Sequence, residues 1–318
     1  MRKWLERELP LAALAVAFWP AWQWLAIRVA SDSADAWGLV SFATAGALLW
    51  RDRAGLSPGG DSHHHSQTHS HTSRAGTAAG VGRGAGIGTG IGTAAGVGCG
   101  AGIGAGFGAG ARARWTLPIV LTVAYAASFP FTPPLLHAII AMTAITAACS
   151  SLWSNKPLDL RLWGLLLLAL PLVPTLNFYL GYPLRVLVGD VASALLQLNG
   201  LAVTRDGAAL VWDGKQVSID APCSGIKMLW TGLYSSCALA MLLRLEGWRF
   251  VLLVTCAVLV VLLANILRAT ALFYVEAGFL PQAAPAHEAI GVVVFAAAAI
   301  LIALGANRLR SLDREELA

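Results

Sequence analysis

Eight predominantly apolar stretches recur along the chain and constrain its fold more than any other feature. Each approaches the roughly 20 residues that an α-helix needs to cross a bilayer. In lipid, backbone polar groups must be satisfied within the segment, which favours helices. Charged residues make up 12% of the chain, against about a quarter in soluble domains. We therefore predict an all-α integral membrane helix bundle of about eight transmembrane helices. The predicted spans are residues 10–28, 36–50, 115–131, 135–153, 162–179, 223–243, 250–275 and 287–306.

The positions of lysine and arginine predict the orientation of these helices. Cytoplasmic loops of membrane proteins carry an excess of both residues. With the N-terminus in the cytoplasm, all but six of the 22 lysines and arginines fall on the cytoplasmic side. The six outer residues are Arg28, Arg185, Arg205, Lys215, Lys227 and Arg268. We expect a multi-pass protein of a bacterial cytoplasmic (inner) membrane, surrounded by membrane lipids. No basic soluble patch is visible, so no nucleic-acid partner is expected.

A low-complexity stretch, residues 51–114, divides the chain. It opens with a group of histidines, His63, His64, His65, His69 and His71, and continues with glycine at nearly every second position. Glycine loses much freedom on ordering, so we predict a disordered His/Gly-rich cytoplasmic linker. The histidines could instead bind a metal ion weakly. The even spacing of the glycines excludes a G-x-G-x-x-G dinucleotide motif. The predicted organisation is two transmembrane helices in 1–50, the linker, a six-helix catalytic membrane domain in 115–306 and a cytoplasmic tail in 307–318.

One sizeable loop, residues 180–222, is expected on the outer side of the membrane. From Arg185 onward, apolar residues at helical spacing predict a small extracytoplasmic amphipathic helix near the membrane surface. A β-hairpin should follow, because Asp206-Gly207 and Asp213-Gly214 are turn signals between short strand-like stretches. Those stretches are residues 202–204, 209–212 and 215–219. The hairpin then leads the chain to Cys223.

Cys223 lies where this loop meets a long apolar helix. The N-terminus of a helix carries partial positive charge, which lowers the pKa of a thiol and favours the nucleophilic thiolate. Lys227 lies four residues on, so the same helix face should carry a second positive charge. Of the five cysteines, Cys223 alone is expected to face outward, so a disulfide within the chain is not expected. A reactive thiol and a buried structural cysteine are the two interpretations.

Two ionisable residues are expected at the same depth as Cys223. Arg268 lies late in the seventh span, about 18 residues past its inner end and therefore near the outer face. Asn265 lies three residues earlier and shares its helix face. His287 begins the eighth span. Alone, Arg268 could extend to the interface and His287 could be a polar helix start. Together with Cys223 they would bring a thiol, a guanidinium and an imidazole to one level.

These segments resemble the exosortase/archaeosortase family. Pro222-Cys223-Ser224-Gly225-Ile226, Asn265-Ile266-Leu267-Arg268 and His287-Glu288-Ala289-Ile290-Gly291 look like its three signature blocks. The resemblance covers about residues 115–306 and implies a membrane cysteine peptidase or transpeptidase with Cys223, Arg268 and His287 as catalytic residues. It implies, as substrates, exported proteins with a C-terminal short motif, membrane span and basic tail (PEP-CTERM type). The polysaccharide-export machinery is one option for a further partner.

A mechanism follows from these assignments as a hypothesis. The Cys223 thiolate would attack a peptide carbonyl at the outer membrane surface to form an acyl-enzyme, and His287 would act as general base and then acid. Arg268 would stabilise the thiolate or the oxyanion, a contribution of roughly 3–4 kcal/mol in such sites. Asn265, Ser224, Gly225 and Lys227 would have supporting roles. Water or an acceptor amine would release the product. We expect no cofactor and no catalytic metal ion.

Three other functions were weighed. A small-solute transporter or channel would explain the spans and the intramembrane Arg268, but it predicts repeated halves and binding groups near the midplane. A metalloprotease is suggested by His287-Glu288, yet Gly291 stands where the second histidine of H-E-x-x-H would be. A non-catalytic scaffold for polysaccharide export would not need an activated thiol. The transporter is the main alternative.

Overall fold

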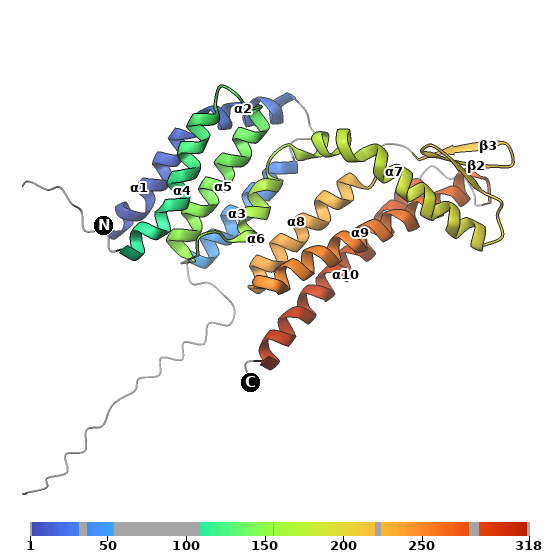
Figure 1. Ribbon diagram of the computed structural model, residues 1–318. Helices are drawn as coiled ribbons and strands as arrows, with labels where there is room; N and C mark the ends of the chain where they lie inside the picture. The colour runs from blue at the N-terminus through green and yellow to red at the C-terminus, as the bar shows by residue number, and fades with distance from the viewer. Residues whose placement is uncertain are drawn as a thin grey trace, which may run out of the picture.

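The computed structural model describes residues 2–31, 37–53, 109–154, 156–219, 224–279 and 286–316. These residues are mostly helical and include one small sheet (Figure 1). The helices are α1 (Arg2–Ala17), α2 (Trp19–Ser31), α3 (Trp37–Arg53), α4 (Ala109–Ser128), α5 (Pro134–Trp153), α6 (Leu160–Leu168), α7 (Leu172–Leu198), α8 (Ile226–Leu243), α9 (Gly247–Glu276) and α10 (Ala286–Glu316). The strands are β1 (Thr204–Asp206), β2 (Ala209–Trp212) and β3 (Lys215–Ser218). Cys223, the histidine group and most of the predicted linker lie outside the described residues.

The helices pack around two apolar clusters. In one, Phe18 lies edge-on to Tyr125 of α4 and contacts apolar residues of α1, α2 and α5. The larger cluster joins α3, α5, α6, α8, α9 and α10, with Met142, Leu165 and Leu253 among its most buried side chains. Figure 1 shows α1, α4 and α5 side by side, with α8, α9 and α10 forming a second layer of helices. The prediction of a mostly helical membrane protein is confirmed.

The number of eight spans is not confirmed. Judged by length and apolar character, four described helices can cross a bilayer: α5, α8, α9 and most of α10. The number rises to six if α1 with α2, and α6 with α7, each count as one bent span. Residues 115–128 of α4 form a shorter apolar helix. Residues 51–53 and 109–114, at the two ends of the predicted linker, are helical.

The expected continuous span at 162–179 is wrong. The chain breaks between α6 and α7, and the two helices differ in direction by 88°. Pro171 occupies the position before α7 and has no backbone N–H to continue the ladder of α6, and it also disfavours helical geometry at Leu170. The amphipathic helix expected from Arg185 is therefore the second half of α7, which starts thirteen residues earlier, at Leu172. A similar break at Phe18 bends α1 against α2 by 65°.

The small sheet agrees with the predicted hairpin, apart from the first strand, which begins two residues later than expected. β1, β2 and β3 form an antiparallel meander in that order. Asp213 and Gly214 have φ values of 48° and 72°, the left-handed geometry of a tight two-residue hairpin turn. One face of the sheet packs on α7 and α9 through Leu210, Leu196 and Phe273. The sheet therefore lies at the end of α9 that is remote from Gly247 (Figure 1).

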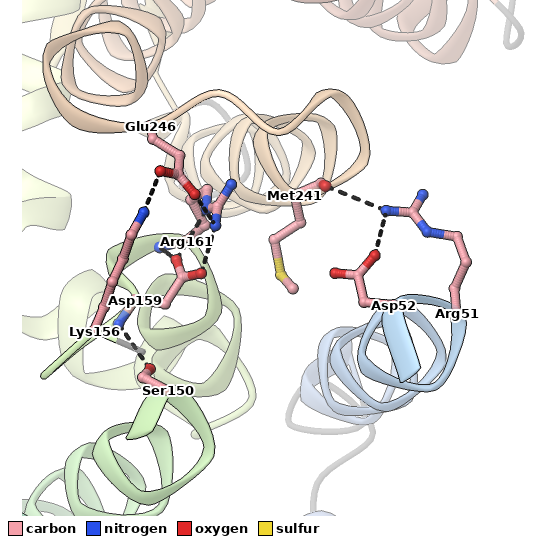
Figure 2. Close-up of polar contacts among 8 residues, drawn as sticks. All are labelled: Arg51, Asp52, Ser150, Lys156, Asp159, Arg161, Met241 and Glu246. Carbon is pink, nitrogen blue, oxygen red and sulfur yellow. Dashed lines mark hydrogen bonds and ion pairs between the residues drawn. The ribbon is translucent and has the colours of Figure 1, made fainter. Parts of the chain in front are cut away.

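An ion-pair network lies at the other end of α9, where the connection between α5 and α6 meets the connection between α8 and α9 (Figure 2). Arg161 donates two hydrogen bonds to the Asp159 carboxylate, at 2.9 and 2.6 Å, and one to Glu246 at 2.9 Å. Lys156 also pairs with Glu246. Burial alone would raise the pKa of Asp159, but the hydrogen bonds and charge of Arg161 outweigh it and hold that pKa below its ordinary value. Lys156 and Arg161 were both expected on the cytoplasmic side.

Candidate functional site

Ser224 and Gly225 lead into α8, and Gly225 lies against Asn265 of α9. Ser224 is 3% exposed and Asn265 is 2% exposed, so both are buried polar residues. Gly225 has a φ of 76°, which residues with a Cβ atom rarely adopt. A methyl group at Gly225 would lie 2.8 Å from Cγ and Nδ2 of Asn265. Glycine is therefore required at position 225 both by backbone geometry and by the close approach of Asn265.

The sequence argument for Lys227 needs correction. The helix expected to begin at Cys223 begins at Ile226, with Gly225 as its N-cap. The spacing of four residues puts two side chains on one face only within a continuous helix, and the left-handed Gly225 interrupts it. Lys227 lies in the first turn of α8 and is exposed. The first N–H groups of α8 still give this end of the helix its partial positive charge.

Arg268 of α9 lies against α10. A methyl group at Gly291 would be 3.5 Å from Nε and 3.7 Å from Nη2 of Arg268. These are ordinary van der Waals distances, so a methyl group would fit here and the guanidinium group packs directly beside position 291. Gly291 was notable in the sequence because a histidine there would complete a zinc motif. The structure indicates a different reason for a small residue at this position, namely the packing of Arg268.

His287, at the start of α10, faces Glu276 at the end of α9. Nδ1 of His287 lies 3.9 Å from Oε1 of Glu276. This distance exceeds a hydrogen bond but allows an ion pair when the imidazole is protonated. The side chains are 48% and 52% exposed, so both are accessible to solvent or substrate. Sequence reasoning missed Glu276, although it is the one acidic residue of α9 and ends that apolar helix beside a histidine-bearing segment.

The candidate residues are staggered along α9 instead of lying at one level. Asn265 contacts Gly225, Arg268 contacts Gly291, and Glu276 faces His287. Asn265 and Glu276 are eleven residues apart, about 16 Å along a helix axis. Gly291 and His287 are four residues apart, about 6 Å along α10. Arg268, beside Gly291, and His287 thus differ by about one helical turn in level. Because Cys223 lies outside the described residues, the common depth of the three residues stays a prediction.

A cleft of about 520 Å³ opens at this end of the molecule. Residues 215–219, which are β3 and the next residue, form one wall. Ala269, Leu272, Phe273 and Glu276 of α9 form another wall, and His287 also borders the cleft. Ile219 and Ser224 flank the segment that carries Cys223. This segment therefore leaves from a residue that lines the cleft and rejoins the described chain beside Asn265.

The described residues supply several groups that a catalytic site could use. They offer a positively polarised helix end at α8, a guanidinium between α9 and α10, and an imidazole paired with a carboxylate beside an open cleft. Such groups suit nucleophilic attack on a carbonyl with general acid–base assistance. Among the described residues, no three His, Cys, Asp or Glu side chains are grouped as metal ligands would be. Cys149, Cys237 and Cys256 lie within α5, α8 and α9; the first two are buried and Cys256 is exposed.

Comparisons with known proteins identify one family. The model of the transmembrane exosortase family (Exosortase_EpsH) matches residues 108–304, well over half of the chain. This segment begins at the start of α4 and ends within α10, so it includes Cys223, Asn265, Arg268 and His287. No curated protein and no solved structure matches the chain. The matched family is the one that the three sequence blocks resemble. The matched range also agrees with residues 115–306, which the resemblance was expected to cover.

Proposed function

Because the chain belongs to the transmembrane exosortase family, we propose that it is a cysteine peptidase or transpeptidase of the membrane. Its substrates are exported proteins that end in a sorting signal of the PEP-CTERM type: a short motif, a membrane span and a basic tail. The reaction takes place at the outer face of a bacterial inner membrane. The family match is the observation that carries this proposal, and the matched range of residues 108–304 spans Cys223, Arg268 and His287.

Cys223 is the proposed nucleophile. Its thiolate sulfur attacks the carbonyl carbon of the scissile peptide, a C–S bond forms and a tetrahedral oxyanion results. The C–N bond then breaks, and the amine leaves with a proton while the acyl group stays on sulfur. The nearby N-terminus of α8 supports this role, because the positive end of a helix favours a thiolate. Water or an acceptor amine then attacks the thioester and regenerates the thiol.

His287 is the proposed general base and acid. It accepts the thiol proton, delivers a proton to the leaving amine, and later takes a proton from the incoming water or amine. Glu276 is the proposed orienting partner, since its carboxylate faces Nδ1 at 3.9 Å. With Nδ1 directed at Glu276, Nε2 is the ring nitrogen left for the reaction. Catalytic contacts in a protein without substrate are often longer than in the reacting complex.

Arg268 is the proposed stabiliser of negative charge on the thiolate or the oxyanion. It lies between the contact of Gly225 with Asn265 and the pair of His287 with Glu276 along α9. A guanidinium is always charged near neutral pH and presents several donors in one plane. Asn265 supports the turn that carries Ser224 and Gly225, and Lys227 adds positive charge near the start of α8. The polysaccharide-export machinery is kept as a proposed partner.

The test is processing of a reporter precursor, a secreted protein fused to a C-terminal motif, span and basic tail from the organism that encodes this chain. We expect Cys223→Ala and Arg268→Ala each to abolish processing while membrane insertion and protein level stay nearly unchanged. Cys223→Ser should also fail, because a hydroxyl without a strong base stays protonated. Accumulation of the unprocessed precursor is followed by immunoblot, with Cys256→Ala as the matched cysteine control. Normal processing by Cys223→Ala would end the peptidase proposal and favour the transporter.

A further inference from the structure

The cleft beside His287 is bordered by the edge of a strand. Successive side chains of a strand point to opposite faces, so a cavity on one face meets every second residue. Here Lys215, Gln216, Val217, Ser218 and Ile219 all line the same cleft. Leu210 of β2 also lines the cleft, so the cleft reaches under one face of the sheet. Because five consecutive residues of one strand border it as well, it also runs along the edge of that strand. The edge of β3 that faces away from β2 is therefore the edge that the cleft exposes.

The register of the sheet identifies the backbone groups on this edge. In an antiparallel pair, hydrogen-bonded and non-hydrogen-bonded residue pairs alternate. The tight turn at Asp213-Gly214 makes Trp212 and Lys215 a hydrogen-bonded pair, and the N–H of Ile219 donates to the carbonyl of Ala208 at 2.9 Å. The backbone N–H and C=O groups therefore point toward β2 in Lys215, Val217 and Ile219. The N–H and C=O groups of Gln216 and Ser218 point away from β2, toward the cleft.

The two edges of the sheet differ in the described part of the chain. At the β1 edge, Arg205 pairs with Asp190 of α7 and also donates to the carbonyl of Gly207. Gly189 of α7 lies close to the Arg205 side chain, so the helix packs against this strand. The β3 edge instead borders open space, and β2 is the one described strand with which β3 pairs. An exposed edge of this kind is a template for pairing with another extended chain.

The dimensions and surroundings of the cleft fit a peptide. Residues 215–219 extend over about 13 Å, enough for four or five residues of an added strand. The opposite wall consists of Ala269, Leu272, Phe273 and Glu276, which lie on one face of α9. The first three are at most 8% exposed and pack inward, whereas the Glu276 side chain is 52% exposed. His287 borders the same cleft. A chain paired with β3 would therefore run beside the proposed general base.

We propose that an extended segment of the substrate, next to its scissile bond, adds to β3 as a fourth strand. Backbone groups of Gln216 and Ser218 would bind the peptide backbone, as in other cases of strand addition. This inference rests on the proposed function for the identity of the peptide. It goes further by assigning substrate binding to the β3 edge. Binding through the backbone requires an extended, unstructured segment ahead of the membrane span.

Site-specific photo-crosslinking tests this binding mode in the full-length Cys223→Ala protein with the reporter precursor. One photoreactive residue replaces Gln216 on β3, and in a matched control one replaces Thr204 on β1. Gln216 and Thr204 both pair with Val211, so they share one face of the sheet and differ only in the edge they occupy. We expect crosslinking to the precursor, just ahead of its membrane span, to be at least about tenfold stronger from position 216, because strand addition is confined to the free edge.

A second pair of variants separates the contribution of the Ser218 backbone N–H from that of the Ser218 side chain. Ser218→Pro removes an N–H that the sheet itself does not use, a change that edge strands tolerate, whereas Ser218→Ala keeps it. We expect Ser218→Pro to reduce crosslinking from position 216 about five- to tenfold, as loss of a backbone hydrogen bond should, and Ser218→Ala to change it less than twofold. Equal crosslinking from 204 and 216 would overturn the proposal. Crosslinks from position 216 that reach only lipid, a second copy or the chain itself would also overturn the proposal.

The outcomes separate this inference from the proposed function. The crosslinking protein lacks the thiol, so binding is measured without chemistry, and processing is measured separately with the wild-type protein. Processing without crosslinking at position 216 would refute strand addition and leave the peptidase intact. Crosslinking at position 216 without processing would refute the peptidase and leave the binding site.

Discussion

Gly225 illustrates how a single residue connects the backbone to the candidate site. Its φ of 76° and its contact with Asn265 both require the absence of a side chain. We predict that Gly225→Ala lowers the free energy of unfolding by about 2 kcal/mol, because left-handed geometry costs about 1–2 kcal/mol without glycine and the added methyl group overlaps Asn265. Thermal unfolding in detergent and reporter processing measure the two effects. Gly305→Ala is the matched control, since nothing lies within 4 Å of a methyl group there. Equal stability of both variants would contradict this account.

Glu276 is the candidate site residue that the structure reveals and the sequence analysis did not predict. Its carboxylate lies 3.9 Å from Nδ1 of His287 and can hold the imidazole in one orientation. We predict that Glu276→Gln slows processing about tenfold, less than the 10²-fold or more contributed by general acid–base catalysis itself. Glu276→Asp should retain more activity than Glu276→Gln, because it keeps the charge. The rate of precursor loss in a pulse-chase experiment measures this. The neighbouring Glu288→Gln is the control, and equal losses in both glutamine variants would argue against a specific pairing with His287.

At the scale of elements, a buried ion pair at the start of α6 is linked through Arg161 to Glu246 in the loop before α9. Asp159 is 7% exposed and Arg161 is 9% exposed, and they form a two-bond ion pair. Removing one partner of such a pair typically costs about 3–5 kcal/mol. We predict that Asp159→Asn destabilises the protein by about 3 kcal/mol. Glu246→Gln should cost less, since the Glu246 side chain is 47% exposed.

The same pair predicts a dependence on pH. The folded-state pKa of Asp159 is lowered, so its stabilising effect is fully present above the pKa of the unfolded chain, about 3.9. It is lost as pH falls through the lower folded-state pKa. The difference in melting temperature between wild type and Asp159→Asn should therefore shrink below about pH 4. Melting curves in detergent from pH 3 to 7 measure this difference. A constant difference over that range would show that the Asp159 charge does not contribute.

For the whole molecule, the two ends of α9 carry different chemistry. Glu246, just before Gly247, joins the network with Lys156 and Arg161, whereas Glu276 and the sheet lie at the far end. The 30 residues of α9 extend over about 45 Å, enough to separate the two surfaces of a membrane. We predict that reporter fusions at Gly207 and near Gly90 report opposite sides of the membrane, with Gly207 outside. The same side for both fusions would overturn the topology and the proposed outer site.

Local sequence determined the elements that depend on local chemistry. The apolar runs produced helices because lipid leaves the backbone no other partners, and Asp213-Gly214 produced a hairpin because both residues readily adopt a positive φ. The order and spacing of the Cys223, Arg268 and His287 blocks were enough to identify the family. The break at Pro171 had a local cause too, but the apolar run around it concealed the bend.

Tertiary structure alone decided which distant residues meet. The contacts of Gly225 with Asn265, Arg268 with Gly291 and Glu276 with His287 depend on how far α8 and α10 are shifted along α9. A shift of one turn changes every such contact by about 5.4 Å, and apolar runs with imprecise ends do not specify it. The cleft along β3 likewise exists because α7 covers the β1 edge and leaves the other open. The local sequence determined which segments form helices. Packing between segments far apart in the chain determined how the helices are shifted against one another and which edge of the sheet is exposed.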